Sequence, residues 1–144
     1  MEAVIEKSFE IEEPIDKVWA NLSNPMEVAL CVPGAAITQQ IDEKNYKGEV
    51  TLKFGPIKAK FDGDIEMIEL DNSSYRMVMS GKGLDSKGKG SADMVMNGDL
   101  QASDGGTNVH FKMTVNIVGT IAQFGSRIIN DVSDQLLKQF ITNF

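Results

Sequence analysis

The chain has 144 residues, of which 42% are hydrophobic and 24% charged. These shares are close to ordinary globular usage, so a disordered chain and a fibrous repeat are excluded, and the length fits a single domain over residues 1–144. Fourteen basic and twenty-one acidic residues give a net charge of −7, which repels the phosphates of nucleic acids and of anionic membranes, so we expect no nucleic-acid partner and at most peripheral membrane contact.

Cysteine and histidine each occur once, as Cys31 and His110. An intrachain disulfide and a zinc site of the Cys/His type are therefore excluded. No window approaches the eighteen or so apolar residues of a membrane span, and no apolar run of signal-peptide length is found near the amino terminus. We expect a cytoplasmic protein.

The first elements are a strand and two short helices. From Ala3 to Ile11 the apolar residues Ile5, Phe9 and Ile11 fall on one parity, which predicts a half-buried strand. The polar residues Glu6, Ser8 and Glu10 fall on the other parity. Pro14 then occupies a place that the first turn of a helix tolerates, and a second helix restarts at Asn24. We expect two small helices over residues 14 to 31.

The middle of the chain, after Pro33-Gly34, alternates between apolar and polar residues with few interruptions. This pattern predicts successive strands, each with one wet face, around residues 46–54, 57–67, 75–79, 90–96 and 107–117. Turn clusters at residues 55–56, 71–72, 81–88 and 104–106 separate them. Short connections of this kind predict an antiparallel meander.

After Gly119 the apolar residues recur with the period of a helix and form a wide apolar stripe. A helix over these remaining residues would be about 36 Å long. A curved sheet wrapped around such a helix buries both apolar surfaces. The predicted fold class is therefore α+β, with a curved antiparallel sheet of about seven strands around a long carboxy-terminal helix and two short helices after the first strand.

Six of the eight methionines share the inward parity of neighbouring strands: Met67, Met77, Met79, Met94, Met96 and Met113. Methionine adapts to varied apolar partners, so this interior is either an ordinary core or the lining of a pocket for a hydrophobic ligand. Gly48, Gly63 and Gly90 share the same parity, where they indicate either a bend in the strands or space for a ligand.

Catalytic patterns are incomplete in this sequence. Residues 83–90 resemble a phosphate-binding loop, but Gly90 stands where a Ser or Thr belongs and a strand pattern follows. His110 has outward parity, and Asp62 and Asp64 lie on a wet face. We therefore assign no catalytic residue, no metal site and no cofactor.

Five motifs in order carry a family resemblance, namely Pro14 to Trp19, Cys31 to Gly34, Phe54 to Ile57, Gly81 to Gly90 and Val118 to Arg127. Together they resemble the CoxG family, named for the G subunit of carbon monoxide dehydrogenase, in the START-like helix-grip (SRPBCC) superfamily. The resemblance covers nearly the whole chain. It implies a helix-grip fold with an apolar cavity between sheet and long helix, and an accessory role beside molybdenum hydroxylases of the carbon monoxide dehydrogenase type.

Three functions are compatible with this resemblance. The first is a non-enzymatic carrier of a lipid or an isoprenoid quinone, and the second is a recruitment or assembly factor that docks the molybdenum hydroxylase without transporting a ligand. The third is an enzyme like the cyclases and hydratases of the superfamily, which would need polar groups inside, where the inward parity offers chiefly Tyr75 and Thr107.

For the carrier, the predicted ligand-binding residues are the inward apolar side chains Phe54, Phe61, Tyr75, Met77, Met79, Met94, Met96, Phe111, Met113, Phe124, Ile128 and Val132. A buried ligand needs an entrance, and glycine-rich segments open at low cost. We expect the cavity mouth at residues 33–36, 81–90 and 121–128, with Gly125 inside the last helix permitting it to lift or pack closely.

Overall fold

Seven strands and three helices follow one another in the order that the hydrophobic periodicity predicts, namely a strand, two helices, six strands and a helix. The structure is a computed structural model that describes residues 1–54, 57–88, 90–119, 122–123 and 125–144, without the side chains of Phe54, Ile57 and Ser126. Its elements are β1 (Glu2–Ile11), α1 (Ile15–Leu22), α2 (Pro25–Cys31), β2 (Ala35–Gln40), β3 (Asn45–Phe54), β4 (Ile57–Asp71), β5 (Arg76–Asp85), β6 (Gly90–Ser103), β7 (Gly106–Gly119) and α3 (Gly125–Asn143).

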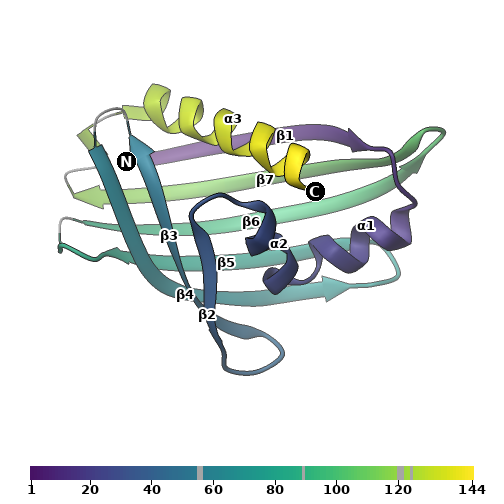
Figure 1. Cartoon of the computed structure of the whole chain (residues 1–144), viewed down its shortest axis with the longest axis horizontal. Helices are drawn as coiled ribbons and strands as arrows, with labels where there is room; N and C mark the ends of the chain where they lie inside the picture. The colour runs from purple at the N-terminus through teal and green to yellow at the C-terminus, as the bar shows by residue number, and fades with distance from the viewer. Residues whose placement is uncertain (55–56, 89, 120–121, 124) are drawn as a thin grey trace.

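The strands form one antiparallel sheet in the order β1-β7-β6-β5-β4-β3-β2. The first strand pairs with the last, from Glu2 opposite Asn116 to Ile11 opposite Thr107. The helices lie over one face of this sheet, with α3 running along β1 and β7 and with α1 and α2 beside its carboxyl end (Figure 1). The predicted α+β class with a curved sheet and a long carboxy-terminal helix is confirmed.

A row of glycines explains part of the curvature. Gly48 of β3 lies opposite Gly63 of β4, which lies opposite Gly83 of β5. A Cβ atom on Gly63 would lie 1.8 Å from the Lys82 carbonyl oxygen, so only glycine permits this approach of the two strands. Of the two interpretations of the inward glycines, a tight bend accounts for Gly63.

Two groups of buried side chains fill the space between the sheet and the helices. The first, the α3 cluster, lies under the amino-terminal half of α3 and consists of Ala3, Ile5, Ala59, Phe61, Ile117 and Ile129. The second, the α1 cluster, lies under α1 and consists of Ile11, Val18, Trp19, Leu22, Met67, Met77, Leu100 and Val109.

The structure corrects two details of the sequence analysis. The segment Gly81–Asp85 belongs to β5 and is paired with β4, so the turn predicted at residues 81–88 begins only at Ser86. Gly125 is the first residue of α3, with a φ of +78° and open space around it, and does not lie inside the helix. Glycine at this position permits the left-handed backbone at the start of α3, and it is not required for close packing or for a bend in the helix.

Within the described residues, the longest helix, α3, lacks the apolar composition needed to cross a membrane, and the shorter helices lack the length.

Candidate ligand-binding site

A row of four methionines crosses the inner face of the sheet. In the strand register Met67 of β4 lies opposite Met79 of β5, Met79 opposite Met96 of β6, and Met96 opposite Met113 of β7. Ile5 of β1 continues the row beyond Met113. Alternation alone gave the parity of these residues, and the register places them side by side on four consecutive strands. We call Met67, Met79, Met96 and Met113 the methionine row.

Most of this row remains partly exposed. Met67 is 5% exposed, whereas Met79, Met96 and Met113 are half-buried, as is Met94 in the next row. Met79 and Met96 pack against the α1 cluster and Met113 against the α3 cluster. The methionine row therefore spans the two clusters at positions where the core is incompletely closed.

Helix α3 presents an equally incomplete surface to the sheet. Ile129 is its buried residue within the described part, Ile141 is 39% exposed, and the other residues of its apolar stripe are half-buried, at Ile128, Val132, Leu136, Leu137 and Phe140. Its last turn is tied to α2, because Asn143 Nδ2 donates to the Cys31 carbonyl oxygen at 3.2 Å. Two apolar surfaces thus face each other, and each keeps part of its area accessible to solvent.

The other predicted lining residues fall into three groups. Phe61 and Met77 are buried in the two clusters, at 7% exposure each. Phe111, Ile128 and Val132 are half-buried and pack against the α3 cluster. Phe124 and the side chain of Phe54 lie outside the described residues.

Tyr75 is half-buried and packs against the α1 cluster. It precedes β5 in the turn after β4, with a φ of +55°, and its ring meets that of Trp19 edge-on with centroids 5.8 Å apart. Its hydroxyl donates to Asp16 Oδ1 at 2.5 Å, and this hydrogen bond raises the pKa of Tyr75. The chain turns at this residue, so the predicted strand begins one residue later, at Arg76.

The turn that holds Tyr75 is stabilised by Asp71, whose carboxylate accepts from the amides of Ser73 and Ser74 and from the Ser73 hydroxyl at 2.7 Å. These hydrogen bonds favour the charged form and lower the pKa of Asp71 to about 2. In the same turn, Asn72 Oδ1 accepts from Trp19 Nε1 at 2.9 Å. The β4–β5 turn is therefore fastened to α1.

Polar groups on the inner face are few and already engaged. Thr107 is fully buried, and its hydroxyl donates to the Glu13 carbonyl oxygen at 2.8 Å. Among the described residues, no buried side-chain nitrogen or oxygen lacks a hydrogen-bond partner, and no group of three potential ligands is placed to hold a metal ion.

Two inner charged residues were missed by the sequence analysis, namely Lys7 and Asp85, which is 8% exposed opposite Phe61. Lys7 has the parity of Ile5 and Phe9, is half-buried, and forms an ion pair with Asp134 of α3. The alternation of the first strand contains the signal, since Lys7 interrupts its apolar parity.

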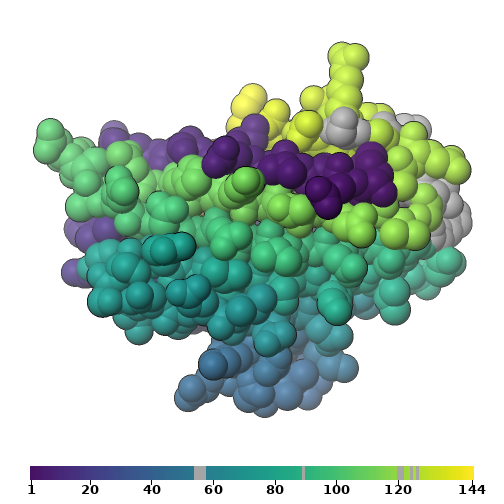
Figure 2. Space-filling view, turned by 180° about the vertical axis from the view of Figure 1, so that it is seen from behind, coloured from purple at the N-terminus to yellow at the C-terminus, as the bar shows by residue number. Residues whose placement is uncertain are grey.

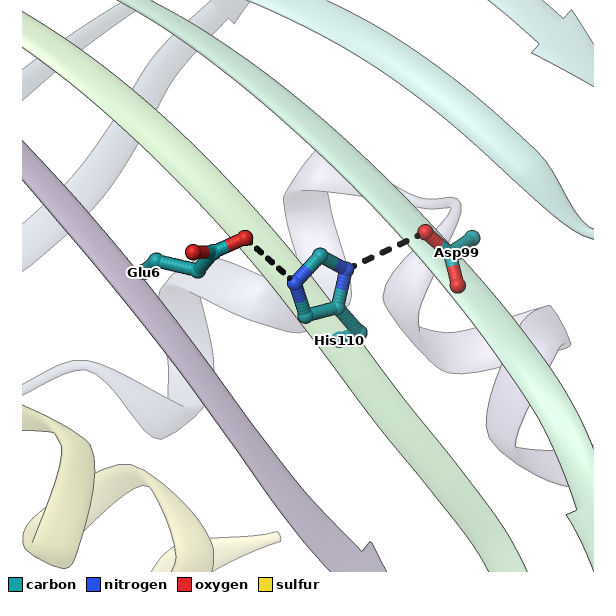
Figure 3. Close-up of polar contacts among 3 residues, drawn as sticks. All are labelled: Glu6, Asp99 and His110. Carbon is teal, nitrogen blue, oxygen red and sulfur yellow. Dashed lines mark hydrogen bonds and ion pairs between the residues drawn. The ribbon is translucent and has the colours of Figure 1, made fainter.

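The outer face carries a polar cluster centred on His110. Its Nε2 lies 2.9 Å from Glu6 Oε2 and its Nδ1 lies 3.3 Å from Asp99 Oδ2, so the side chain links β1, β7 and β6 (Figure 3). The hydrogen bonds to Glu6 and then Asp99 raise the pKa of His110. Because both nitrogens face carboxylates, this imidazole is suited to hold a proton and poorly suited to act as a base.

Two depressions open beside the polar residues of the outer face. One has a volume of about 590 Å³ and is lined by Ser8, Phe9, Glu10, Asp99, Gln101, Asn108, Val109 and His110. The other, of about 280 Å³, is lined by Ile41, Asn45, Tyr46, Asp64, Ile65, Glu66, Ser80 and Lys82. Neither lining includes a methionine.

Comparison with protein families shows which family the chain matches. The family model for CoxG, described as the G subunit of carbon monoxide dehydrogenase, matches residues 8–144. A search of curated proteins found no significant match.

Solved structures share the fold. A conserved protein from Geobacillus kaustophilus has a TM-score of 0.84 at 22% identity, over 99% of this chain and 91% of that one. The Zhui aromatase/cyclase from Streptomyces sp. R1128 has a TM-score of 0.63 at 11% identity, over 99% and 91% of the two chains. Ara h 8.0201 has a TM-score of 0.62 at 14% identity, over 99% and 95%. At these identities the likeness establishes the helix-grip architecture alone.

Proposed function

The chain belongs to the CoxG family, that of the G subunit of carbon monoxide dehydrogenase, and on this premise we propose that it is a non-enzymatic carrier of a hydrophobic small molecule. Its cargo is a lipid or an isoprenoid quinone, and it serves a molybdenum hydroxylase of the carbon monoxide dehydrogenase type. The family name indicates the partner enzyme. A redox enzyme needs an electron acceptor, and a protein that holds a quinone can present one.

The observation that carries the proposal is the pair of facing, half-buried apolar surfaces. Three members of the methionine row, Met79, Met96 and Met113, remain partly exposed, and so does the apolar stripe of α3. Met113 packs against the α3 cluster, and Met79 and Met96 pack against the α1 cluster, which Phe140 of α3 also contacts. A ligand between the methionine row and α3 would remove apolar area from water at about 25 cal/mol per Å². Flexible, polarizable methionine side chains suit an occupant of irregular shape.

An uptake experiment tests the carrier. The purified protein is stripped of lipid, incubated with oleate or a short-chain isoprenoid quinone, and examined by native mass spectrometry. We expect one bound molecule per chain. A chain that takes up neither compound nor an uncharged apolar dye contradicts the carrier function.

A matched pair of variants locates the site. Met96→Trp fills the inner face, whereas Val95→Trp places the same bulk on the outer face of the same strand, where Val95 is 43% exposed. We expect Met96→Trp to lose uptake and Val95→Trp to keep it, with circular dichroism confirming that both fold. Equal uptake by the two variants places the ligand elsewhere.

A recruitment factor is the second candidate, favoured by the outer face. Apolar side chains are exposed there at Val4 (52%), Leu84 (68%), Val95 (43%) and Val118 (58%). Figure 2 shows this face from behind, with β1, β7 and the following strands open to solvent. Solitary exposed apolar residues are common, but four on one face suit protein docking.

An inner-face variant and an outer-face variant together discriminate the two candidates. In a pull-down with a carbon monoxide dehydrogenase-type molybdenum hydroxylase, a recruitment factor retains the enzyme with Met96→Trp and loses it with Leu84→Asp combined with Val118→Asp. A carrier that presents its ligand loses transfer of that ligand with Met96→Trp, whether or not the two proteins still associate.

We rank an enzymatic function below the carrier and the recruitment factor. The polar groups that a cyclase or hydratase would need are engaged in structural hydrogen bonds, Thr107 to Glu13 and Tyr75 to Asp16. An enzyme that depends on Tyr75 would lose turnover with Tyr75→Phe in a substrate screen, whereas we expect no turnover in either protein.

A further inference from the structure

Lys7 is a charged residue on an otherwise apolar stretch of the inner face. It lies between Ile5 and Phe9 on the inward parity of β1, and in the register it stands opposite Phe111 of β7. Over the described inward positions of β1, β5, β6 and β7, the charged side chains are Lys7 and Asp85. Asp85 is 8% exposed and lies opposite Phe61, near the far end of the sheet.

The position of Lys7 relative to the methionine row is set by the register. Ile5, two residues before Lys7 and on the same parity, continues that row, and Phe111 likewise stands two residues before Met113. The lysine therefore belongs to the adjacent cross-strand row, on the edge strand of the sheet. Its stem is long enough to lie along apolar neighbours while the ammonium group stays at the rim.

The present partner of Lys7 is exchangeable. Its ammonium group pairs with Asp134 of α3, and the side chains of the two residues are 33% and 50% exposed. Ion pairs with this exposure contribute little net stability, because water competes for both charges. Another oxygen anion can therefore replace Asp134 without a large loss of folding free energy.

We propose that Lys7 is the polar anchor of the ligand, and that the preferred ligand class is a long-chain carboxylate or a similar anionic lipid. The ammonium group donates to the ligand's carboxylate at the rim, and the hydrocarbon part lies between the methionine row and α3. This inference rests on the proposed carrier function. It ranks an anionic lipid above a neutral quinone, whose carbonyl oxygen is a weaker acceptor for an ammonium group.

Displacement of an uncharged dye tests the anchor. The protein is loaded with N-phenyl-1-naphthylamine, which is then displaced by oleate, by methyl oleate or by a short-chain isoprenoid quinone. We expect oleate to bind more tightly than its methyl ester. Lys7→Met should weaken oleate about tenfold, the loss expected for one hydrogen bond to a charged group, and leave methyl oleate unchanged.

Three further variants control the result. Lys112→Met removes a lysine from the outer face of the neighbouring strand and should change nothing. Lys7→Arg should keep most of the preference for oleate. Asp134→Asn, which frees Lys7 from its competitor, should raise the affinity for oleate severalfold and also serves if Lys7→Met fails to fold.

The outcomes separate the anchor from the carrier. If the wild-type protein binds neither the dye nor any of the three compounds, the carrier function itself fails. If it binds the dye but does not distinguish oleate from its ester, and Lys7→Met and Asp134→Asn leave both unchanged, the anchor is overturned while the carrier stands. A quinone that binds more tightly than oleate overturns the ranking of ligand classes.

Discussion

The α1 cluster and the α3 cluster are built on the same sheet but are held together differently. The α1 cluster is closed by side-chain hydrogen bonds between distant segments, from Trp19 to Asn72 and from Thr107 to Glu13. Over the α3 cluster, the helix contributes the buried Ile129 and an otherwise half-buried stripe, and it meets the edge strand through the exposed pair of Lys7 and Asp134. From this difference we expect that α1 anchors the fold and that α3 is the element that moves.

The largest expected effect on stability is at Trp19 of α1. Trp19 is 7% exposed and makes both a ring contact and a hydrogen bond, so Trp19→Ala should lower the free energy of unfolding by about 3–5 kcal/mol. Ile128→Ala in the half-buried stripe should cost only about 1–2 kcal/mol, since part of that side chain is already in water. Urea denaturation measures both, and equal costs would contradict the distinction between the two clusters.

A smaller effect isolates the hydrogen bond that fastens α1. Asn72→Ala leaves the indole N–H of the buried Trp19 without its partner, which should cost about 1–3 kcal/mol. Asn97→Ala, at an exposed position on β6, is the matched control and should have little effect on urea denaturation. If the two variants are equally stable, the β4–β5 turn does not anchor α1.

Hydrogen exchange with and without ligand compares the two clusters directly. We expect a smaller change in free energy than for Trp19→Ala or Asn72→Ala. The amides of α3 should gain protection when oleate or quinone binds, whereas those of α1 should change little, because that end is already closed. The amides of residues 33–36 should be followed as well, because this segment was predicted to form part of the cavity mouth. The chain is tightly packed at Gly34, where the φ is +81° and an added Cβ atom would lie 2.6 Å from the Thr51 carbonyl oxygen. Protection gained in the central strands alone would show that neither α3 nor residues 33–36 move.

The smallest effect lies on the outer face and depends on pH. The folded-state pKa of His110 is raised above its ordinary value of 6.5 by Glu6 and Asp99, so its stabilisation is present below that value and is lost as pH rises through the folded pKa. His110→Gln should therefore be less stable than wild type at pH 6 and nearly equal to it at pH 9. Thermal unfolding at the two pH values measures this, and a difference that grows with pH would contradict it.

Alternation and helical periodicity were sufficient to predict the sheet, the helices and the inward parity of the methionines. They do not contain the strand register, so the alignment of Met67, Met79, Met96 and Met113 as one row emerged only from the structure. Register depends on where turns begin, and the glycines at residues 81–83 are typical of turns although they are paired within β5.

One misplaced residue has a clear physical cause. Gly125 has a positive φ of +78° at the start of α3, where the chain changes direction and the helical period does not yet apply. Lys7 was missed for a different reason: a charged residue on an apolar parity is easily treated as an exception, and its partner Asp134 lies on an element far away in the sequence.

The most direct test of the account follows the methionines themselves. The protein contains eight, and ¹³C-methyl labelling gives each a resonance that single Met→Leu variants assign. On titration with oleate or a short-chain isoprenoid quinone, we expect the methyl signals of Met79, Met94, Met96 and Met113 to shift together, while that of Met26, which is 42% exposed on α2, stays in place. Saturable binding that leaves all four inner methyl signals unchanged would contradict a ligand site between the methionine row and α3.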